Sequence, residues 1–245
     1  MPSVCAVILA AGSSARMCGI NKQFIALKGI PVIVKSALAF EKTALISEII
    51  IAAKESDIDE ITRLCRRYGI TKLKAVVSGG NERFDSVKNA LPCVSDGCDY
   101  IAVHDGARPL VTSEKIGEII EKAVEFRAAI PAVMARDTAK ITDGSGTIVS
   151  TPPRKNVFLA QTPQIFEKKL YLAAIQALDG DFSGITDDSM IVERFGHPVH
   201  IVEGDYSNIK ITAREDIAVA EILMEGVALD AGKIRIGYGY DVHRL

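Results

Sequence analysis

Short apolar runs alternate with segments of helical periodicity along most of this 245-residue chain. Strand-like runs occupy residues 4–10, 48–53, 73–78 and 99–104. Helical spacing of apolar side chains marks residues 32–40, 58–68 and 113–126, the last with Ser113 as its expected N-cap. This alternation predicts an α/β fold with right-handed βαβ units and a largely parallel sheet covered by helices on both faces.

Composition narrows the function classes. A net charge of −2 argues against a general binder of nucleic acid, because such domains usually carry a basic surplus. The five cysteines are odd in number and form no CxxC motif, which is typical of reduced packing residues in a cytoplasmic protein. No apolar run reaches the roughly 18 residues of a membrane span, so we expect a soluble protein.

A loop rich in small residues follows the first strand, in the stretch LAAGSSARMCGINKQ at residues 9–23. The small side chains of Ala10, Ala11 and Gly12 would let a polyphosphate reach backbone N–H groups, and Arg16 and Lys22 would supply countercharge. The loop matches neither the P-loop nor the dinucleotide-binding pattern. An ordinary strand-to-helix turn with two solvated cations is the alternative.

Polar loops follow three of the predicted strands, at Gly12, Gly80 and Asp105. Ligands in sheets of this kind gather outside the carboxyl ends of the strands. We therefore expect the loops to present one set of polar side chains to a single crevice: Arg16, Lys22, Arg83, Ser86, Asp105 and Arg108. Taken alone, Asp105 also suits a turn or a helix N-cap.

The pattern changes at residues 135–158, where the strand-like pieces AKIT and TIVS flank a turn at residues 143–146. This predicts a protruding β-hairpin arm. Because an isolated hairpin is marginally stable in water, we expect the arm to pack against a second copy of the chain in a homodimer.

Helices and one more strand are expected in the C-terminal part. Helices are predicted at residues 166–178, after the acidic cluster 186–188, and at 213–229, with Thr212 and Glu215 as a capping box; residues 199–202 read as a strand. Lys210 lies just before the last helix. Its side chain would point either into the crevice or outward into solvent.

Seven ordered motifs resemble the 2-C-methyl-D-erythritol 4-phosphate cytidylyltransferases of the non-mevalonate isoprenoid pathway. They are LAAGSSARM with KQ, GGNERFDSV, VHDGARP, RDT, TPQ, TDD and NIKIT. The resemblance implies a Rossmann-like three-layer nucleotidyltransferase fold with a β-hairpin dimerisation arm. It also implies transfer of a cytidylyl group from CTP to the phosphate of methylerythritol phosphate, with Mg²⁺ and release of pyrophosphate.

The same resemblance implies roles for individual residues. The residues expected to bind CTP are Ala10, Ala11, Gly12, Gly80, Asn81, Arg83 and Ser86. Asp105 is expected to bind Mg²⁺. The catalytic positive charge is assigned to Arg16, Lys22, Arg154 and Lys210. Binding of the acceptor is assigned to Arg108, Thr138 and Thr186. Thr138 and Arg154 would come from the arm of the other subunit. Asn21 and Gly106 replace residues common in the family, and the TPPRK context of Arg154 makes its alignment less direct than that of Lys210.

The end of the chain departs from this pattern. We expect a cytidylyltransferase domain over residues 1–230 and a linker with a truncated start of a second domain over residues 231–245. The segment IRIGYGYDVHRL resembles the opening strand of the 2-C-methyl-D-erythritol 2,4-cyclodiphosphate synthases, in which Asp241 and His243 would bind a metal ion. Because these are too few ligands for a complete site, we expect no cyclase activity. A chance C-terminal tail is the alternative.

Two rival functions share these features. A ribitol-5-phosphate cytidylyltransferase has a similar framework and would differ in the acceptor pocket. A non-catalytic nucleotide sensor or dimeric scaffold could use the same fold. The simultaneous presence of Arg16, Lys22, Asp105 and Lys210 argues against it, because a sensor has no need for transition-state charge.

Overall fold

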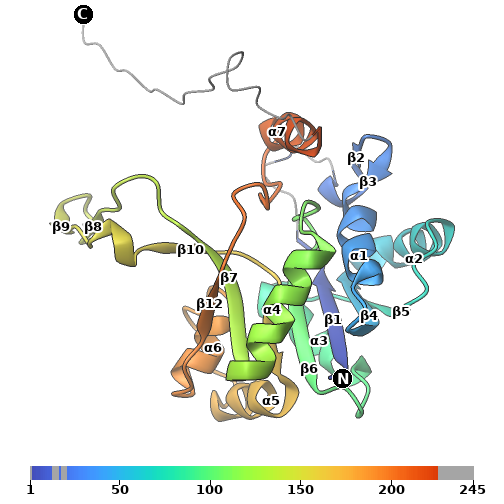
Figure 1. Ribbon diagram of the computed structural model, residues 1–245, viewed down its shortest axis with the longest axis horizontal. Coiled ribbons are helices and arrows are strands. Elements are labelled where there is room, and N and C mark those ends of the chain that lie inside the picture. Colours follow the sequence, from blue (N-terminus) through green and yellow to red (C-terminus); the bar gives the residue numbers. More distant parts are fainter. Residues whose placement is uncertain (1, 13–16, 18–20, 226–245) are drawn as a thin grey trace, which may run out of the picture.

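A central eight-stranded sheet organises the protein (Figure 1), which a computed structural model describes for residues 2–12, 17 and 21–225. The strand order is β10-β7-β11-β6-β1-β4-β5, with β12 also pairing β7. Strands β1, β4, β5 and β6 are parallel, whereas β11 runs antiparallel between β6 and β7. The bounds are β1 (Val4–Leu9), β4 (Ile46–Ala53), β5 (Leu73–Ser78), β6 (Tyr100–Asp105), β7 (Ala128–Met134), β10 (Phe158–Ala160), β11 (Gln164–Glu167) and β12 (His200–Glu203). The largely parallel α/β sheet is thus confirmed.

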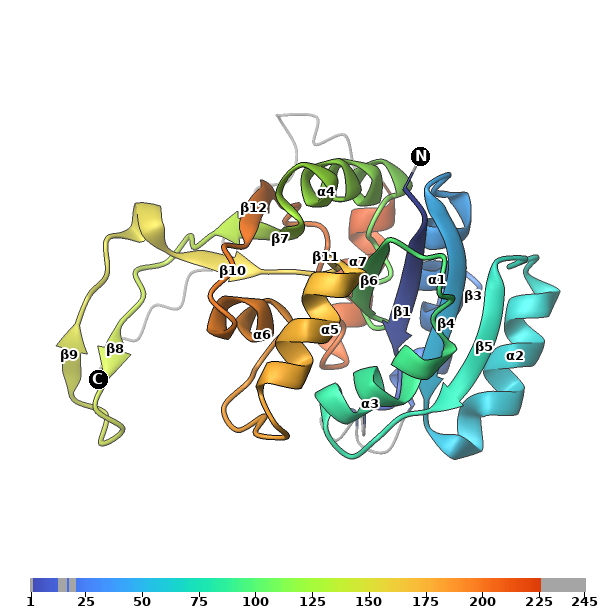
Figure 2. The same ribbon diagram turned by 90° about the horizontal axis from the view of Figure 1, so that it is seen from below.

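Helices cover both faces of the sheet. One face carries α1 (Val32–Lys42), α2 (Ile58–Arg67) and α4 (Ser113–Phe126), and the other carries α3 (Arg83–Ala90), α5 (Lys168–Ala177) and α6 (Ser189–Arg194). Figure 2 shows α4 on the side of the sheet opposite to α3, α5 and α6. Each face of the sheet packs against its helices in a separate apolar core, and alternate residues of β1 point into the two cores. Ile8 lies in the core with α1, α2 and α4, and Val7 lies in the core with α3, α5 and α6. The three-layer arrangement follows from strands buried on both faces.

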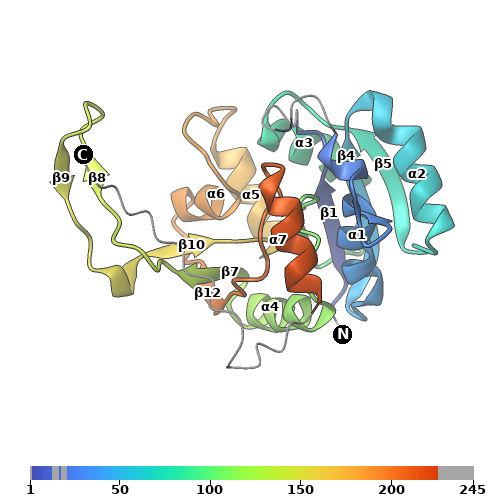
Figure 3. The ribbon, with the colours of Figure 1, turned by 90° about the horizontal axis from the view of Figure 1, so that it is seen from above.

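A smaller apolar cluster joins the C-terminal helix to the N-terminal part of the chain. Helix α7 (Glu215–Met224) lies across the end of the sheet (Figure 3) and contributes Ala220. Its partners include Leu27 from the short pair β2 (Ala26–Leu27) and β3 (Ile30–Pro31). This packing fixes residues 208–212, the segment just before α7, over the carboxyl ends of the central strands.

The predicted arm is present as a β-hairpin that extends away from the sheet (Figures 1 and 2). Strands β8 (Ile141–Thr142) and β9 (Ile148–Ser150) pair antiparallel around a turn in which Asp143 Oδ1 accepts hydrogen bonds from Ser145. The chain enters the arm from β7 and returns along β10, which pairs with β7.

In the second half, one helix start was predicted wrongly and one strand was not predicted. Residues 164–167 form a strand, and helix α5 begins at Lys168 rather than at Phe166. The reason is that Ile165 and Phe166 point to opposite cores, as neighbours in a buried strand do. Strand β7 was not predicted, because Arg127, at φ 69°, joins it to α4 without any intervening polar loop.

Two helix caps also differ from the predictions. Thr112, not Ser113, caps α4, since its hydroxyl accepts a hydrogen bond from the Lys115 N–H at 3.2 Å. The expected capping box at Thr212 uses Asp216 instead of Glu215: the Asp216 carboxylate accepts bonds from Thr212 and from the Ala213 N–H. Helix α7 accordingly begins at Glu215, not at residue 213. Residues 226–229 of the predicted helix lie outside the described residues.

Within the described ranges, every helix is too short or too polar to cross a bilayer.

Candidate active site

The loops after β1, β5 and β6 surround one cavity, of about 180 Å³. Its walls contain most of the residues assigned from the sequence to CTP: Ala11, Gly12, Gly80, Asn81, Arg83 and Ser86, together with Lys22, Asp105 and Lys210. Ala10 does not line the cavity, because it is buried and its N–H donates to the Ala52 carbonyl of β4 at 2.7 Å. The predicted convergence of the three loops is confirmed.

A second cavity, of about 190 Å³, adjoins the first. Arg108 and Thr186, which the sequence assigned to the acceptor, line it together with Thr162, Gln164 and Asp187. Among the described residues, three side chains line both cavities: Arg83, Asp105 and Lys210. They form a shared wall, so ligands in the two cavities would meet at these residues.

Asp105 is the electrostatic centre of the shared wall. Its carboxylate lies 2.9 Å from Lys210 Nζ, 3.4 Å from Arg83 Nε and 3.6 Å from Arg108 Nε. Burial alone would raise the pKa of this carboxyl, but the cations around it hold the pKa well below its usual range. Asp105 therefore stays ionised. Of the two orientations open to Lys210, the structure shows the inward one.

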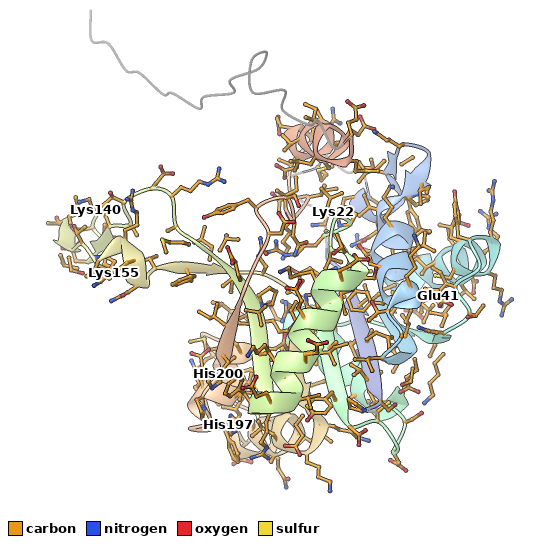
Figure 4. All side chains as sticks on the ribbon, in the orientation of Figure 1. Lys22, Glu41, Lys140, Lys155, His197 and His200 are labelled. Carbon is orange, nitrogen blue, oxygen red and sulfur yellow. The ribbon has the colours of Figure 1, made fainter. Side chains whose placement is uncertain are left out.

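Residues 208–211 are fastened to the site through their backbone. Lys22 Nζ donates to the Ile211 carbonyl at 3.0 Å, and Arg108 Nη1 donates to the Asn208 carbonyl at 2.7 Å. The Ile211 N–H donates to the Ala107 carbonyl in return. Figure 4 places Lys22 at the end of the sheet beneath α7. The cations of the site thus hold the segment that presents Lys210.

Small residues allow the loops after β1 and β5 to touch. A Cβ atom on Gly79 would lie 2.4 Å from the Ala11 Cβ, and one on Gly80 would lie 2.1 Å from the Asp85 Cβ. Ser86, 4% exposed, accepts a hydrogen bond from the Gly80 N–H at 3.1 Å. Besides lining the cavity, Ser86 therefore fixes the backbone of the glycine loop.

His104 and Thr162 form a buried pair behind the site, which was not predicted from the sequence. The Thr162 hydroxyl accepts a hydrogen bond from the Asp105 N–H at 3.1 Å and donates to His104 Nδ1 at 3.0 Å. His104 Nε2 then donates to the Arg108 carbonyl at 3.2 Å. Burial lowers the pKa of His104 to about 4, so the ring is neutral. Both residues lie in motifs quoted above, VHDGARP and TPQ, but only the fold brings these motifs together.

Thr138 and Arg154, two of the predicted acceptor-site residues that the structure describes, line neither of these cavities. Thr138 and Arg154 lie on the arm, where Arg154 Nη1 donates to the Arg136 carbonyl at 3.2 Å. Arg16, Asp241 and His243 lie outside the described residues. In the described part of the chain, His, Cys, Asp and Glu side chains form no cluster of three that could hold a metal ion by themselves.

Comparison with known proteins gives one consistent family. The family model for 2-C-methyl-D-erythritol 4-phosphate cytidylyltransferase (IspD) matches residues 4–226. A protein of that name from Caldanaerobacter subterraneus subsp. tengcongensis is 43% identical over 225 residues, which are 91% of this chain and 99% of the relative. Another, from Syntrophus aciditrophicus, is 40% identical over 91% of this chain and 97% of its own length.

Solved structures agree with this result. The 4-diphosphocytidyl-2C-methyl-D-erythritol synthase of Anaerococcus prevotii superposes with a TM-score of 0.82 at 31% identity, covering 91% of this chain and 96% of its own. The bifunctional IspDF of Campylobacter jejuni superposes with a TM-score of 0.73 at 26% identity. That match covers 88% of this chain and 53% of the bifunctional chain.

Proposed function

The chain belongs to the 2-C-methyl-D-erythritol 4-phosphate cytidylyltransferase family, and from this premise we infer that it transfers a cytidylyl group from CTP to 2-C-methyl-D-erythritol 4-phosphate. One observation carries the proposal at the level of the site: two cavities share a wall of Arg83, Asp105 and Lys210. Nucleotide in the first cavity and acceptor in the second would bring their phosphates together at that wall.

The proposed reaction is an in-line displacement at the α-phosphorus of CTP. An oxygen of the acceptor phosphate forms the new P–O bond, the bond to the β-phosphate breaks, and pyrophosphate leaves with its electron pair. Such a transfer needs positioning and charge stabilisation rather than a covalent nucleophile. Lys22 and Arg16 supply positive charge to the α-phosphate, and Lys210 holds the attacking phosphate at the shared wall.

The first cavity would bind CTP along the loops that surround it. Residues 10–12 bind the triphosphate, although the N–H of Ala10 already donates a hydrogen bond to the Ala52 carbonyl of β4. Gly80 and Asn81 reach the base and ribose, with Ser86 holding the backbone between β5 and α3. Arg108 and Thr186 bind the acceptor in the second cavity.

Mg²⁺ fits the donor set as a partner of the nucleotide. Asp105 is one ionised carboxylate facing both cavities, and Mg²⁺ in phosphoryl-transfer sites usually takes one or two carboxylates plus phosphate oxygens and water. We propose that Asp105 holds it. When bound, the ion would neutralise charge on the phosphates.

The arm supports the proposal of a homodimer. Large apolar side chains are exposed along it, with Ile141, Ile148, Val149 and Leu159 each more than half exposed. A second copy covering this surface would supply Thr138 and Arg154 to the acceptor site of the first. Analytical ultracentrifugation at micromolar concentration would give the mass of a dimer, whereas a monomeric mass would contradict the proposal.

The tail at residues 231–245 is proposed as the start of a second, cyclodiphosphate synthase domain, with Asp241 and His243 as metal ligands, on the resemblance of the segment IRIGYGYDVHRL. The similarity of this chain to a protein described as a bifunctional IspDF is compatible with this proposal.

A pyrophosphate-release assay tests the function. With CTP and Mg²⁺, release should be fastest with methylerythritol phosphate and much slower with ribitol 5-phosphate or common sugar phosphates. Faster release with ribitol 5-phosphate would favour the rival cytidylyltransferase. Binding of CTP without release of pyrophosphate for any acceptor would favour a nucleotide sensor.

We propose the cytoplasm as the site of action.

A further inference from the structure

A buried chain of hydrogen bonds runs from helix α5 to the wall between the two cavities. The Tyr171 hydroxyl donates to Asp188 Oδ1 at 2.6 Å, and Arg83 Nη1 donates to Asp188 Oδ2 at 2.5 Å. On its other side, Arg83 Nε donates to Asp105 Oδ1 at 3.4 Å. Two nitrogens of one guanidinium are therefore held by carboxylates from β6 and from the residue before α6.

Tyr171 and Asp188, which lie farthest from the cavities in this series of hydrogen bonds, are inaccessible to solvent and so cannot bind a substrate themselves. Asp188 and Tyr171 are both 0% exposed, and Tyr171 stacks on Phe166 with ring centroids 4.9 Å apart. Burial and the neighbouring Asp188 raise the pKa of Tyr171 well above its usual value, so its hydroxyl keeps the proton that it donates. A fully buried carboxylate is costly unless it is paired and hydrogen-bonded, and here Arg83 and Tyr171 meet that need.

The remaining nitrogen of Arg83 is unpaired. Its Nη2 atom is buried and has no hydrogen-bond partner among the described residues. A buried donor without a partner is unfavourable, and an oxygen atom of a ligand or of water that reached it would relieve this cost. Because Arg83 lines both cavities, its side chain lies where the two substrates would approach each other.

We propose that Arg83 binds phosphate oxygens at the wall between the cavities, rather than the base, and that Asp188 and Tyr171 are positioning residues that fix its guanidinium. The inference rests on the proposed function and specifies which part of CTP Arg83 binds within it. A pyrimidine ring is uncharged, whereas phosphates are the groups that a fixed guanidinium recognises best. Asp105 and Asp188 set the orientation of the guanidinium from opposite sides.

If the hydrogen bonds between Tyr171, Asp188 and Arg83 had a purely structural role, the expected result would be different. In that case Tyr171 and Asp188 would only join α5 and α6 to α3, and removing the Tyr171 hydroxyl would lower the unfolding temperature without changing turnover. The test therefore compares the effect of Tyr171→Phe on kcat in the wild-type chain and in an Arg83→Lys chain, which keeps the charge but loses the forked geometry. Tyr68→Phe is the matched control, since it removes a hydroxyl bonded to the Gly29 carbonyl away from both cavities.

Turnover is measured by pyrophosphate release with full-length protein, well below the unfolding temperature of each variant. Tyr171→Phe should lower kcat about tenfold in the wild-type chain and less than twofold in the Arg83→Lys chain, because its effect passes through Arg83. Tyr68→Phe should leave kcat unchanged. An unchanged kcat for Tyr171→Phe, or equal losses in both backgrounds, would overturn the proposal.

Binding measurements by calorimetry keep the test independent of turnover. Arg83→Lys and Tyr171→Phe should each weaken CTP binding severalfold while leaving the affinity for cytidine, which has no phosphate, unchanged. Equal weakening for CTP and cytidine would assign Arg83 to the base and refute the proposal. Wild-type protein that binds CTP but never releases pyrophosphate would refute the proposed function alone, and the binding comparison would still decide the role of Arg83.

Discussion

The two ends of the central sheet carry lysine–carboxylate pairs of nearly the same geometry. At the carboxyl ends of the strands, Lys210 Nζ lies 2.9 Å from Asp105, and at the amino ends Lys74 Nζ lies 3.1 Å from Glu48. The lysine side chains are 39% and 40% exposed, and both carboxylates are 11% exposed. The pairs differ in what else surrounds each carboxylate.

Glu48 is satisfied mainly by neutral donors. It accepts bonds from the Ser95 N–H at 2.8 Å, from the Ser95 hydroxyl at 2.6 Å and from Cys98 Sγ at 3.4 Å. Burial alone would raise its pKa, but the bonds from Ser95 and Lys74 lower the pKa to about 2. This carboxylate is fully paired, so we assign the cluster to the stability of the fold.

Asp105 instead faces a surplus of cations. Arg83, Arg108 and Lys210 all contact it, and the wall that they form opens into two cavities. Like charges gathered beside a cavity are unfavourable for the fold alone and favourable once an anion binds. The comparison teaches that a site is recognised by unbalanced charge next to open space, rather than by a buried ion pair.

The largest expected effect concerns Lys22. Replacing it by Ala should lower kcat for pyrophosphate release by about 10² or more, because a lost transition-state contact typically costs ~3 kcal/mol. CTP should still bind, and this is checked by calorimetry. An unchanged kcat would mean that Lys22 has only a structural role, through its hydrogen bond to the Ile211 carbonyl.

A second prediction concerns the pH dependence of stability at the site end. The pKa of His104 is about 4 in the folded chain and 6.5 when unperturbed, so between these values the unfolded chain binds more protons. The contribution of neutral His104 is complete above pH 6.5 and is lost as the pH falls through 4.

Urea unfolding of the wild type and His104→Gln at several pH values measures this contribution. The difference in unfolding free energy between the two proteins should shrink by about 3 kcal/mol from pH 7 to pH 4. A difference that stays constant with pH would mean that His104 is not buried in its neutral form.

A third, smaller effect is expected at the opposite end of the sheet. Glu48→Gln should lower the free energy of unfolding by about 1–3 kcal/mol, because it removes a hydrogen-bonded buried carboxylate. It should leave kcat within twofold of wild type. A large loss of kcat in a folded Glu48→Gln protein would break the division between a stabilising end and a functional end.

The sequence predicted those parts of the site that local patterns encode. Parallel strands followed by polar loops at Gly12, Gly80 and Asp105 had to bring these loops to one edge of the sheet, and the structure confirms this. The direction of Lys210 was open, since only packing of α7 decides it. The contact of Thr162 with His104 joins residues 58 positions apart, and no local pattern encodes such a pairing.

The caps show the same limit on a smaller scale. Thr112 and Ser113 are both good N-cap residues, and only the backbone at Thr112, with φ −101° and ψ 155°, shows which one precedes the helix. Likewise Glu215 and Asp216 both follow Thr212 at plausible spacing, and the shorter side chain makes the bonds.

The most direct test of the account is the ratio of kcat values for Lys210→Met and Lys74→Met, measured by pyrophosphate release with saturating CTP, Mg²⁺ and methylerythritol phosphate. The two lysines are matched in exposure and in distance to their carboxylates. We expect kcat to fall about 10²-fold for Lys210→Met and less than twofold for Lys74→Met. Equal kcat values for the two variants would contradict the claim that the cations at the carboxyl ends of the sheet perform the reaction.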